Sequence, residues 1–258
     1  MSFRIAVAGK GGCGKTSIAS LTVRYLKKHG RVPILAVDAD ANSNLGESLG
    51  LKVGQTIGTI LDSFQHEKIS IPLGMTKEAY LEYKLNESIV ESTGIDLVTM
   101  GRGQGPECYC YPNVVLKKFI ENLSAGYASL VMDNEAGMEH LSRKTTEDMD
   151  ALLLVSNHTV KGVRAVARIK ELVAELKLAF RQQLVIINLV PGALDPLITK
   201  EMEQLGLKAD AVIPEDETLN RFDMEQKPLL GMPDDSVAVR AVDALIEKIL
   251  SRVETAQK

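Results

Sequence analysis

A glycine-rich segment near the amino terminus carries the residue types that hold phosphate. It reads Gly-Lys-Gly-Gly-Cys-Gly-Lys-Thr from Gly9 to Thr16, which matches the pattern Gly-x-x-x-x-Gly-Lys-Ser/Thr. Glycines let backbone N–H groups curl around phosphate oxygens without Cβ clashes, and the start of a helix adds the positive end of its dipole. The segment therefore predicts a nucleotide site, with ATP as the expected ligand. The residues expected to contact the nucleotide here are Gly9, Lys10, Gly11, Gly12, Cys13, Gly14, Lys15, Thr16 and Ser17.

The side chains of this loop have separate expected roles. Lys15 can reach the β- and γ-phosphates, the Thr16 hydroxyl can ligate Mg²⁺, and Ser17 can contact the α-phosphate. Cys13 occupies a variable position, where we expect it to fill space. The alternative is a glycine-rich turn that matches by chance, and the apolar run before it and the helical pattern after it argue against that alternative.

Carboxylates close two further apolar runs, at Asp38 and Asp40 and at Asp133. Carboxylates at the carboxyl ends of strands lie beside the phosphate crevice of an α/β sheet. Asp133 suits the Walker B position, and we expect Thr16, Asp40 and Asp133 to form the Mg²⁺ site, with Gly137 allowing a close approach to the γ-phosphate. Asp38 and Asp40 would point to the same side of an extended chain. For either of them the alternative is an acidic cap on the next helix.

A pair of cysteines lies in a Gly- and Pro-rich stretch, residues 101–112, whose composition is typical of a loop. Cys108 and Cys110 supply two thiolates, whereas a closed tetrahedral soft-metal site takes four ligands and Cys13 belongs to the phosphate loop. A two-fold homodimer would supply the other half of a four-sulfur site, which suits Zn²⁺, Ni²⁺, Cu⁺ or an iron–sulfur cluster. Metal binding and nucleotide state would then be coupled through the dimer. Two buried or idle thiols, or a redox pair, are the alternative.

The elements that must position these residues follow from the hydrophobic pattern. Short, nearly continuous apolar runs predict strands covered on both faces, at 4–8, 34–38, 96–100, 129–133, 151–156, 184–189 and 211–214. Helical patterns lie between the strands, at 16–29, 112–123, 161–178, 197–204 and 237–253. This alternation predicts an α/β fold with a single doubly wound, mostly parallel sheet and helices on both faces. We expect one domain over residues 1–258, with a polar, partly helical insertion without a clear strand at 54–93.

Composition restricts the function classes. The chain has 258 residues, 45% hydrophobic and 25% charged, as in an ordinary soluble globular protein. Its net charge of −4, together with 4% aromatics and no Trp, argues against a nucleic-acid partner. The absence of a secretory segment and of an 18-residue apolar run argues against a membrane partner and predicts a cytoplasmic location. Three cysteines, an odd number, do not indicate a disulfide framework.

A second lysine at the start of the loop, Lys10, completes the form Lys-Gly-Gly-x-Gly-Lys-Thr. In this form the sequence resembles the deviant Walker A ATPases, the class of MinD, ParA and the nitrogenase iron protein. The resemblance implies that Lys10 reaches across a homodimer to the partner's nucleotide, whereas the alternative is a solvated loop lysine. It also implies that Asp40 positions the attacking water and that Asp38 senses the γ-phosphate or Mg²⁺. Lys10, Lys15, Asp38 and Asp40 are thus the expected catalytic residues for hydrolysis of ATP to ADP and phosphate.

The resemblance extends to the other end of the chain and departs from the family pattern at one place. An Asn at the position of Asn188 contacts adenine in related folds, and Pro214, Glu215 and Asp216 resemble the second base-contacting loop. An Asn that ends a strand is also common turn chemistry. After Asp133 the family pattern is Asp-Thr-x-Ala-Gly, but here Asn134 and Glu135 fill the middle positions, which leaves open which neighbour contacts water.

The Cys-Tyr-Cys sequence and the Ala-Gly-Met-Glu-His-Leu segment of residues 136–141 narrow the resemblance. Together they are similar to the CooC-type nickel-insertion ATPases, which serve carbon monoxide dehydrogenase and acetyl-CoA synthase. The resemblance implies that Cys108 and Cys110 bind one metal per dimer, nickel or zinc, and that ATP hydrolysis drives maturation of such a client enzyme.

Two other readings stay open. A positioning ATPase of the MinD/ParA type would carry a basic amphipathic helix or a basic stripe, whereas residues 237–253 mix acidic and basic side chains. An iron–sulfur carrier or reductase like the nitrogenase iron protein would hold a cluster on the dimer axis. That protein takes its two cysteines per subunit from separate loops, whereas here both lie in one loop.

Overall fold

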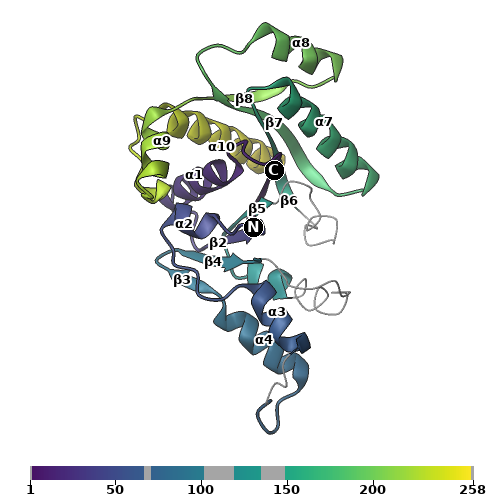
Figure 1. Ribbon diagram of the computed structural model, residues 1–258, viewed down its shortest axis with the longest axis vertical. Coiled ribbons are helices and arrows are strands. Elements are labelled where there is room, and N and C mark those ends of the chain that lie inside the picture. Colours follow the sequence, from purple (N-terminus) through teal and green to yellow (C-terminus); the bar gives the residue numbers. More distant parts are fainter. Residues whose placement is uncertain (1, 67–70, 102–118, 135–148, 257–258) are drawn as a thin grey trace.

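The computed structural model describes residues 2–66, 71–101, 119–134 and 149–256 (Figure 1). In this part of the chain one eight-stranded sheet has the order β3-β4-β2-β5-β1-β6-β7-β8. Every pairing is parallel except the antiparallel pair β3–β4. The strands are β1 (Phe3–Gly9), β2 (Ile34–Ala39), β3 (Val90–Ser92), β4 (Ile95–Thr99), β5 (Ser129–Asn134), β6 (Met149–Asn157), β7 (Phe180–Val190) and β8 (Ala209–Pro214). The predicted doubly wound, mostly parallel sheet is therefore confirmed.

Helices cover both faces of this sheet, and the apolar side chains divide into two cores accordingly (Figure 1). On one face lie α1 (Lys15–Lys28), α2 (Leu45–Leu49) and α10 (Val237–Ala256). On the other face lie α3 (Ile57–His66), α4 (Lys77–Glu87), α7 (Val160–Glu175), α8 (Pro196–Gln204) and helical residues 119–124. Burial on both faces explains why the central strands are apolar at nearly every position.

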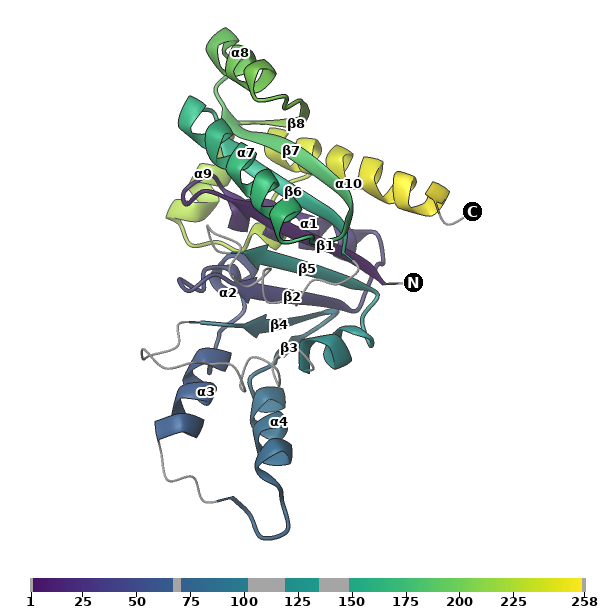
Figure 2. The ribbon, with the colours of Figure 1, turned by 90° about the vertical axis from the view of Figure 1, so that its right-hand side faces the viewer.

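The segment at 54–93 differs in one respect from its prediction. It is helical in part, as α3 and α4, which lie side by side and project from the β3 end of the sheet (Figure 2). The prediction that it holds no strand was wrong, because β3 pairs with β4 at the edge. Three residues with mostly exposed side chains show no hydrophobic alternation, so the pattern could not indicate this strand.

Three further elements lie outside the predicted ones. The short helix α2 follows β2, and α9 (Glu217–Met224) and the 3₁₀ turn η1 (Leu229–Gly231) connect β8 to α10. None of the residues of α9 is fully buried, and only Leu219 and Phe222 pack against the core, so its apolar stripe is too short to be recognised in the sequence. The predicted helix at 112–123 lies outside the described residues except for its last part.

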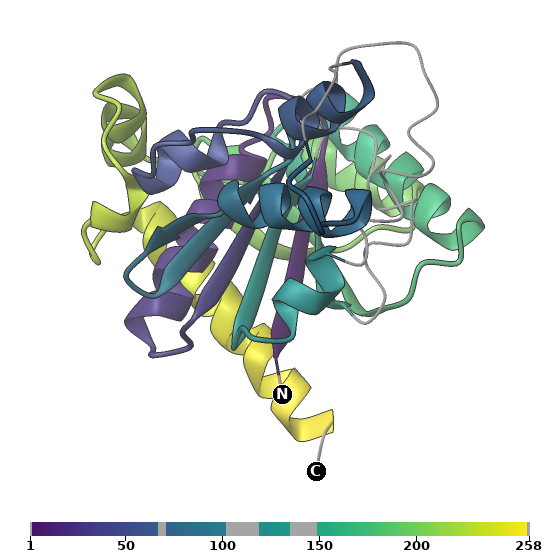
Figure 3. The same ribbon diagram turned by 90° about the horizontal axis from the view of Figure 1, so that it is seen from below.

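Strand β1 occupies the place where the strand order reverses, with β5 and β2 on one side and β6 and β7 on the other. In such sheets ligands bind outside the carboxyl ends of the strands at this switch point. Helix α10 crosses one face and ends near the N-terminus, at the opposite, amino end of the strands (Figure 3). Among the described residues, no helix combines the length and apolarity needed to cross a bilayer.

Candidate nucleotide site

The loop between β1 and α1 has a backbone that requires glycine at several positions. A Cβ on Gly9 would lie 2.2 Å from the carbonyl oxygen of Val155 and 2.8 Å from Cys13 Sγ. Gly12 and Gly14 have φ of +74° and +85°, which is the left-handed region that L side chains rarely adopt. Cys13 is 1% exposed, and burial raises the pKa of its thiol, so it lies in the core as an unreactive thiol.

Helix α1 starts at the end of this loop with free donors. Its N-cap is Gly14, which has no side chain to accept from the first N–H groups, and the first helical bond runs from the Ile18 N–H to the Gly14 carbonyl. The amide groups at a helix start combine with the helix dipole to attract anions. The Lys15 side chain lies beside them and is 6% exposed. Lys10, by contrast, is exposed at the other end of the loop.

Thr16 and Asp133 meet across the loop although 117 residues separate them. The Thr16 hydroxyl donates to Asp133 Oδ2 at 2.6 Å. Asp133 is 1% exposed, and its other oxygen, Oδ1, is buried without a hydrogen-bond partner among the described residues. Burial raises the pKa of Asp133 to about 7; the Thr16 hydrogen bond opposes this, and Asp38 and Asp40 add to it. A hydroxyl beside a carboxylate with an open oxygen is a donor set that fits Mg²⁺.

Asp38 and Asp40 differ in their surroundings. Strand β2 ends at Ala39, so the chain is no longer extended at Asp40, and the expectation that the two carboxylates share one side of a strand is not met. Asp38 is fully buried and accepts the N–H groups of Asp40 and Leu45 at 3.1 and 2.8 Å. Burial raises the pKa of Asp38 to about 6 against these two hydrogen bonds.

Asp38 thus ties the loop after β2 to the start of α2, which is the capping role that the sequence left open. Asp40 is partly exposed, and its Oδ1 accepts both the backbone and the side-chain N–H of Asn42 at 2.9 Å. Of the two, Asp40 is the carboxylate with access to a ligand.

The residues after Asp133 are placed only in part. Asn134 is fully buried, and its Nδ2 donates to the Val7 carbonyl at 3.0 Å, which ties β5 to β1. Glu135, Gly137, Glu139 and His140 lie outside the described residues, as do Cys108 and Cys110. Within residues 2–66, 71–101, 119–134 and 149–256, no group of three or more His, Cys, Asp or Glu side chains is arranged to hold a metal ion.

A hollow beside Gly14 and Ser17 lies at the carboxyl ends of β7 and β8. It is lined by Gly14, Ser17, Ile18, Asn188, Pro214, Leu219 and Asn220, among others, so it contains Asn188 and Pro214 as the sequence predicts for the base. Asn188 Nδ2 donates to the Cys13 carbonyl at 2.9 Å and would lie 2.2 Å from a Cβ on Gly14. Asn188 therefore also holds the phosphate loop in place.

Asp216 also lines this hollow, but its side chain is engaged within the fold, and Glu215 does not line the hollow. Asp216 Oδ1 accepts the N–H groups of Thr218 and Leu219, and Oδ2 accepts the Ser236 hydroxyl and the Ala238 N–H. Both oxygens are therefore committed to capping α9 and α10, and the pKa of Asp216 is lowered because these hydrogen bonds outweigh its burial. The Glu215 side chain is exposed, and its N–H donates to the Val190 carbonyl.

A second hollow adjoins Thr16 and Ser17 on the side of α2, and the sequence did not indicate it. Its walls include Asn44, Glu47 and Ser48 from one side and Phe222, Asp223 and Gln226 from the other. The Ser20 hydroxyl donates to Ser48 Oγ at 2.8 Å and joins α1 to α2. These residues lie in or beside α2 and α9, which were not predicted from the sequence. The hollow therefore becomes apparent only when the two helices are placed around α1.

Comparison with known proteins gives three relevant similarities. Residues 5–229 match the family model described as CobQ/CobB/MinD/ParA nucleotide binding domain. An uncharacterized ATP-binding protein of Methanocaldococcus jannaschii is 38% identical over 96% of this chain and 98% of its own. The carbon monoxide dehydrogenase accessory protein CooC of Rhodospirillum rubrum is 27% identical over 67% of this chain and 70% of its own.

Among solved structures, a ParA family ATPase from Chlorobium tepidum superposes with a TM-score of 0.72 at 17% identity. The match covers 94% of this chain and 97% of that one. At this identity the likeness shows the common fold and no more.

Proposed function

The chain belongs to the CobQ/CobB/MinD/ParA family of nucleotide-binding domains, and from that premise we propose that it is a magnesium-dependent ATPase whose nucleotide state switches a homodimer. The observation that carries the proposal is the hydrogen-bonded pair Thr16–Asp133 at the start of α1. The other carboxylate oxygen of Asp133, Oδ1, has no hydrogen-bond partner among the described residues. The pair lies beside free helix N–H groups and the buried Lys15, so cation and phosphate ligands meet at one place.

Each residue of the site has its own role in phosphoryl transfer. The glycine loop and the α1 N-terminus bind the phosphates, Lys15 pairs with the β- and γ-phosphates, and Thr16 and Asp133 hold Mg²⁺, with Asp40 near them. Mg²⁺, when bound, neutralises charge on the phosphate oxygens. Asp40 orients the attacking water, and Asp38 fixes the loop that carries Asp40. Asn188 and Pro214 line the hollow for the base.

Lys10 is the residue that suggests a second copy. It is exposed at the start of the loop, so its ammonium group is accessible to a partner that docks on this edge. A cation supplied in trans would stabilise charge that builds up on the transferring phosphoryl group.

The test measures Mg-ATP binding by calorimetry, phosphate release, and sedimentation with and without nucleotide. We expect binding that needs Mg²⁺ for full affinity, hydrolysis, and an ATP-dependent shift from monomer to dimer. Asp133→Asn should lose the Mg²⁺ dependence, whereas Asp235→Asn, at an exposed position, is the matched control. A chain that binds no Mg-nucleotide would refute the proposal.

We further propose that the switch handles a soft metal, nickel or zinc, through Cys108 and Cys110 of both protomers, for a client such as carbon monoxide dehydrogenase or acetyl-CoA synthase. The Cys-Tyr-Cys sequence and the similarity to the accessory protein CooC support this proposed role in metal handling. The metal is cargo in this scheme, and hydrolysis opens the dimer and releases it.

The double variant Cys108→Ala/Cys110→Ala tests this proposed role. It should lose stoichiometric Ni²⁺ or Zn²⁺ binding, counted by elemental analysis after dialysis, and retain nucleotide binding. Cys13→Ala, which removes the buried third thiol, is the control and should keep the metal. Unchanged metal binding in the double variant would contradict the proposal, and a brown protein would indicate an iron–sulfur cluster in its place.

A positioning ATPase of the MinD/ParA type is the second candidate, and the family match and the ParA-like fold favour it as much. It would need a surface that binds a cellular scaffold. The charges along α10 are mixed, with Asp243 and Glu247 beside Arg240 and Lys248. Nucleotide-dependent dimerisation without metal binding at Cys108 and Cys110 would favour this candidate.

A further inference from the structure

The segment from residue 217 to residue 236, here called the rim segment, leaves the sheet after β8 and returns at the start of α10. It contains α9 and η1 and forms a wall of both hollows that flank Ser17. Leu219 and Asn220 face the hollow beside Gly14, and Phe222 and Asp223 face the hollow beside Thr16. The position of this segment therefore sets the shape of the site away from the phosphate loop.

Apolar contacts anchor the rim segment only in part. No residue of α9 is buried, and within the segment Leu229, Met232 and Ser236 are the buried residues. Leu219 and Phe222 of α9 and Leu230 pack against the core but are only partly buried. Because apolar burial contributes stability roughly in proportion to the area removed from water, they stabilise this position less than full burial would. The position of α9 therefore also depends on polar contacts and on the chain at its two ends.

Asp216 fixes the two ends of the segment to each other. Its carboxylate caps α9 through Thr218 and Leu219 and joins Ser236 and Ala238 at the start of α10. These contacts close the segment into a loop, but none of them reaches α1. A Cβ on Gly50 would lie 2.5 Å from Pro228, so the end of α2 packs closely on the middle of the loop.

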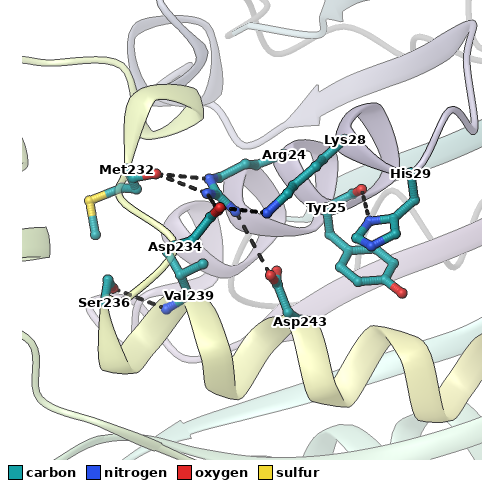
Figure 4. A network of polar contacts seen from close by, with 9 residues as sticks. All are labelled: Arg24, Tyr25, Lys28, His29, Met232, Asp234, Ser236, Val239 and Asp243. Atoms are coloured by element: carbon teal, nitrogen blue, oxygen red, sulfur yellow. Dashed lines mark hydrogen bonds and ion pairs between the residues drawn. The ribbon is translucent and has the colours of Figure 1, made fainter.

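Lys28 and Arg24 of α1 both pair with Asp234 of this loop, and Arg24 supplies the buried polar contacts (Figure 4). Its Nε and Nη2 both donate to the Met232 carbonyl, at 3.2 and 2.9 Å, and Nη2 also pairs with Asp234. Nη1 lies 3.8 Å from Asp243 Oδ2 on α10. The Arg24 side chain is 8% exposed, and a charge so placed is held by its partners and cannot be hydrated instead.

We propose that Arg24 is a positioning residue for the base side of the nucleotide site, which it shapes by holding the rim segment against α1. The inference rests on the proposed function, because it assumes that a nucleotide occupies the hollows. Arg24 lies on the same helix whose first turn meets the phosphates, about two turns further on, so it links the phosphate end and the base end through one rigid element.

Loss of the Arg24 contacts should weaken the binding of a nucleotide and not the binding of phosphate alone. If the rim segment takes its binding-competent position for only a fraction of the time, the apparent Kd for a nucleotide rises by the inverse of that fraction. The phosphate loop is shaped by Gly9, Gly14 and Asn188, none of which contacts Arg24, so affinity for phosphate alone should not change.

The test compares two ligands, Mg-ADP and Mg-tripolyphosphate, on Arg24→Met by calorimetry. Loss of hydrogen bonds from a charged group predicts an ADP Kd raised about tenfold and a tripolyphosphate Kd changed by less than about twofold. Lys28→Met is the matched control, since Lys28 also pairs with Asp234, at 2.7 Å, but has no hydrogen bond to Met232, and it should bind both ligands as the unaltered chain does.

Equal losses for both ligands, or an unchanged ADP Kd, would overturn the inference. Failure of the unaltered chain to bind either ligand would instead overturn the proposed function, and the inference with it.

A second measurement covers the case in which Arg24→Met does not fold. Asp234→Asn acts from the exposed end of the same network and should weaken ADP binding in the same direction by a smaller factor. Hydrogen–deuterium exchange on this variant should be faster in residues 217–231 and unchanged in α1 and the central strands. Uniformly faster exchange, or no change in the rim segment, would contradict a positioning role.

Discussion

Two buried carboxylates at the same edge of the sheet, Asp133 at the phosphate end and Asp216 at the base end, have opposite environments. Asp133 receives one hydroxyl hydrogen bond and keeps an open oxygen, and burial raises its pKa to about 7. Asp216 receives four hydrogen bonds, and its pKa is lowered although burial acts to raise it. A carboxylate with filled acceptors holds the fold together, whereas one with an open acceptor is left for a cation.

The largest effect expected from this contrast is on hydrolysis. Asp133→Asn removes the negative charge that we propose to hold Mg²⁺, so we expect the rate of phosphate release to fall about a thousandfold or more. Asp216→Asn, which touches no phosphate ligand, should retain most of the rate at a temperature where it is folded. Comparable losses in the two variants, measured with saturating Mg-ATP, would remove the distinction between the two carboxylates.

The next effect separates the two lysines of the phosphate loop, the buried Lys15 and the exposed Lys10. Lys10→Ala should lower hydrolysis about a hundredfold and abolish ATP-induced dimerisation, while ATP affinity changes by less than about threefold, because a lysine acting in trans adds little to binding by one protomer. Lys15→Ala should weaken ATP binding itself. Calorimetry and sedimentation on both variants provide the comparison, and a loss of ATP affinity in Lys10→Ala would place Lys10 in its own protomer's site.

A smaller effect concerns stability. Asp216→Asn replaces two acceptor oxygens by one and should lower the free energy of unfolding by about 1 to 3 kcal/mol near pH 7. Because the folded-state pKa of Asp216 lies below the unfolded value, its contribution is present above the unfolded pKa and is lost as the pH falls through the folded one. The difference between variant and unaltered chain, from urea unfolding at pH 7 and pH 3, should therefore shrink in acid; a difference that grows would contradict the assignment.

The smallest expected effect is a gain in stability from Asp133→Asn, opposite in sign to the loss expected from Asp216→Asn. The pKa of Asp133 is raised in the folded chain, so without Mg²⁺ the folded state binds more protons than the unfolded state between about pH 4 and pH 7, and stability falls as the pH rises through this range. Asp133→Asn should therefore stabilise the metal-free chain at pH 8 by about 1 kcal/mol and have less effect at pH 5. Thermal unfolding in EDTA at the two pH values measures this, and a destabilised variant at pH 8 would show that Asp133 serves the fold.

Much of the fold was predictable because its signals are local. Strands covered on both faces are apolar at successive positions, and each of the seven predicted strands is present, with ends that differ by up to four residues. Edge strand β3 and helix α9 were missed because neither has a fully buried apolar face, so their own pattern gives too weak a signal. The local part of the Asp216 cap, its bonds to Thr218 and Leu219, is an N-cap signal that could have been read from the sequence.

By itself, the sequence determined that a glycine loop joins a strand to a helix, and it predicted phosphate binding there, since glycine's backbone freedom and the following helical pattern are properties of adjacent residues. Only the tertiary structure decided which carboxylate is open and which is filled. Thr16, which donates to Asp133, is 117 residues away from it in the chain, and Asn188, which donates to the phosphate loop, is 175 residues from its acceptor. The last two hydrogen bonds to Asp216 come from Ser236 and Ala238. Hydrogen-bond satisfaction depends on all the groups that surround an atom, and the chain brings those groups together only when it folds.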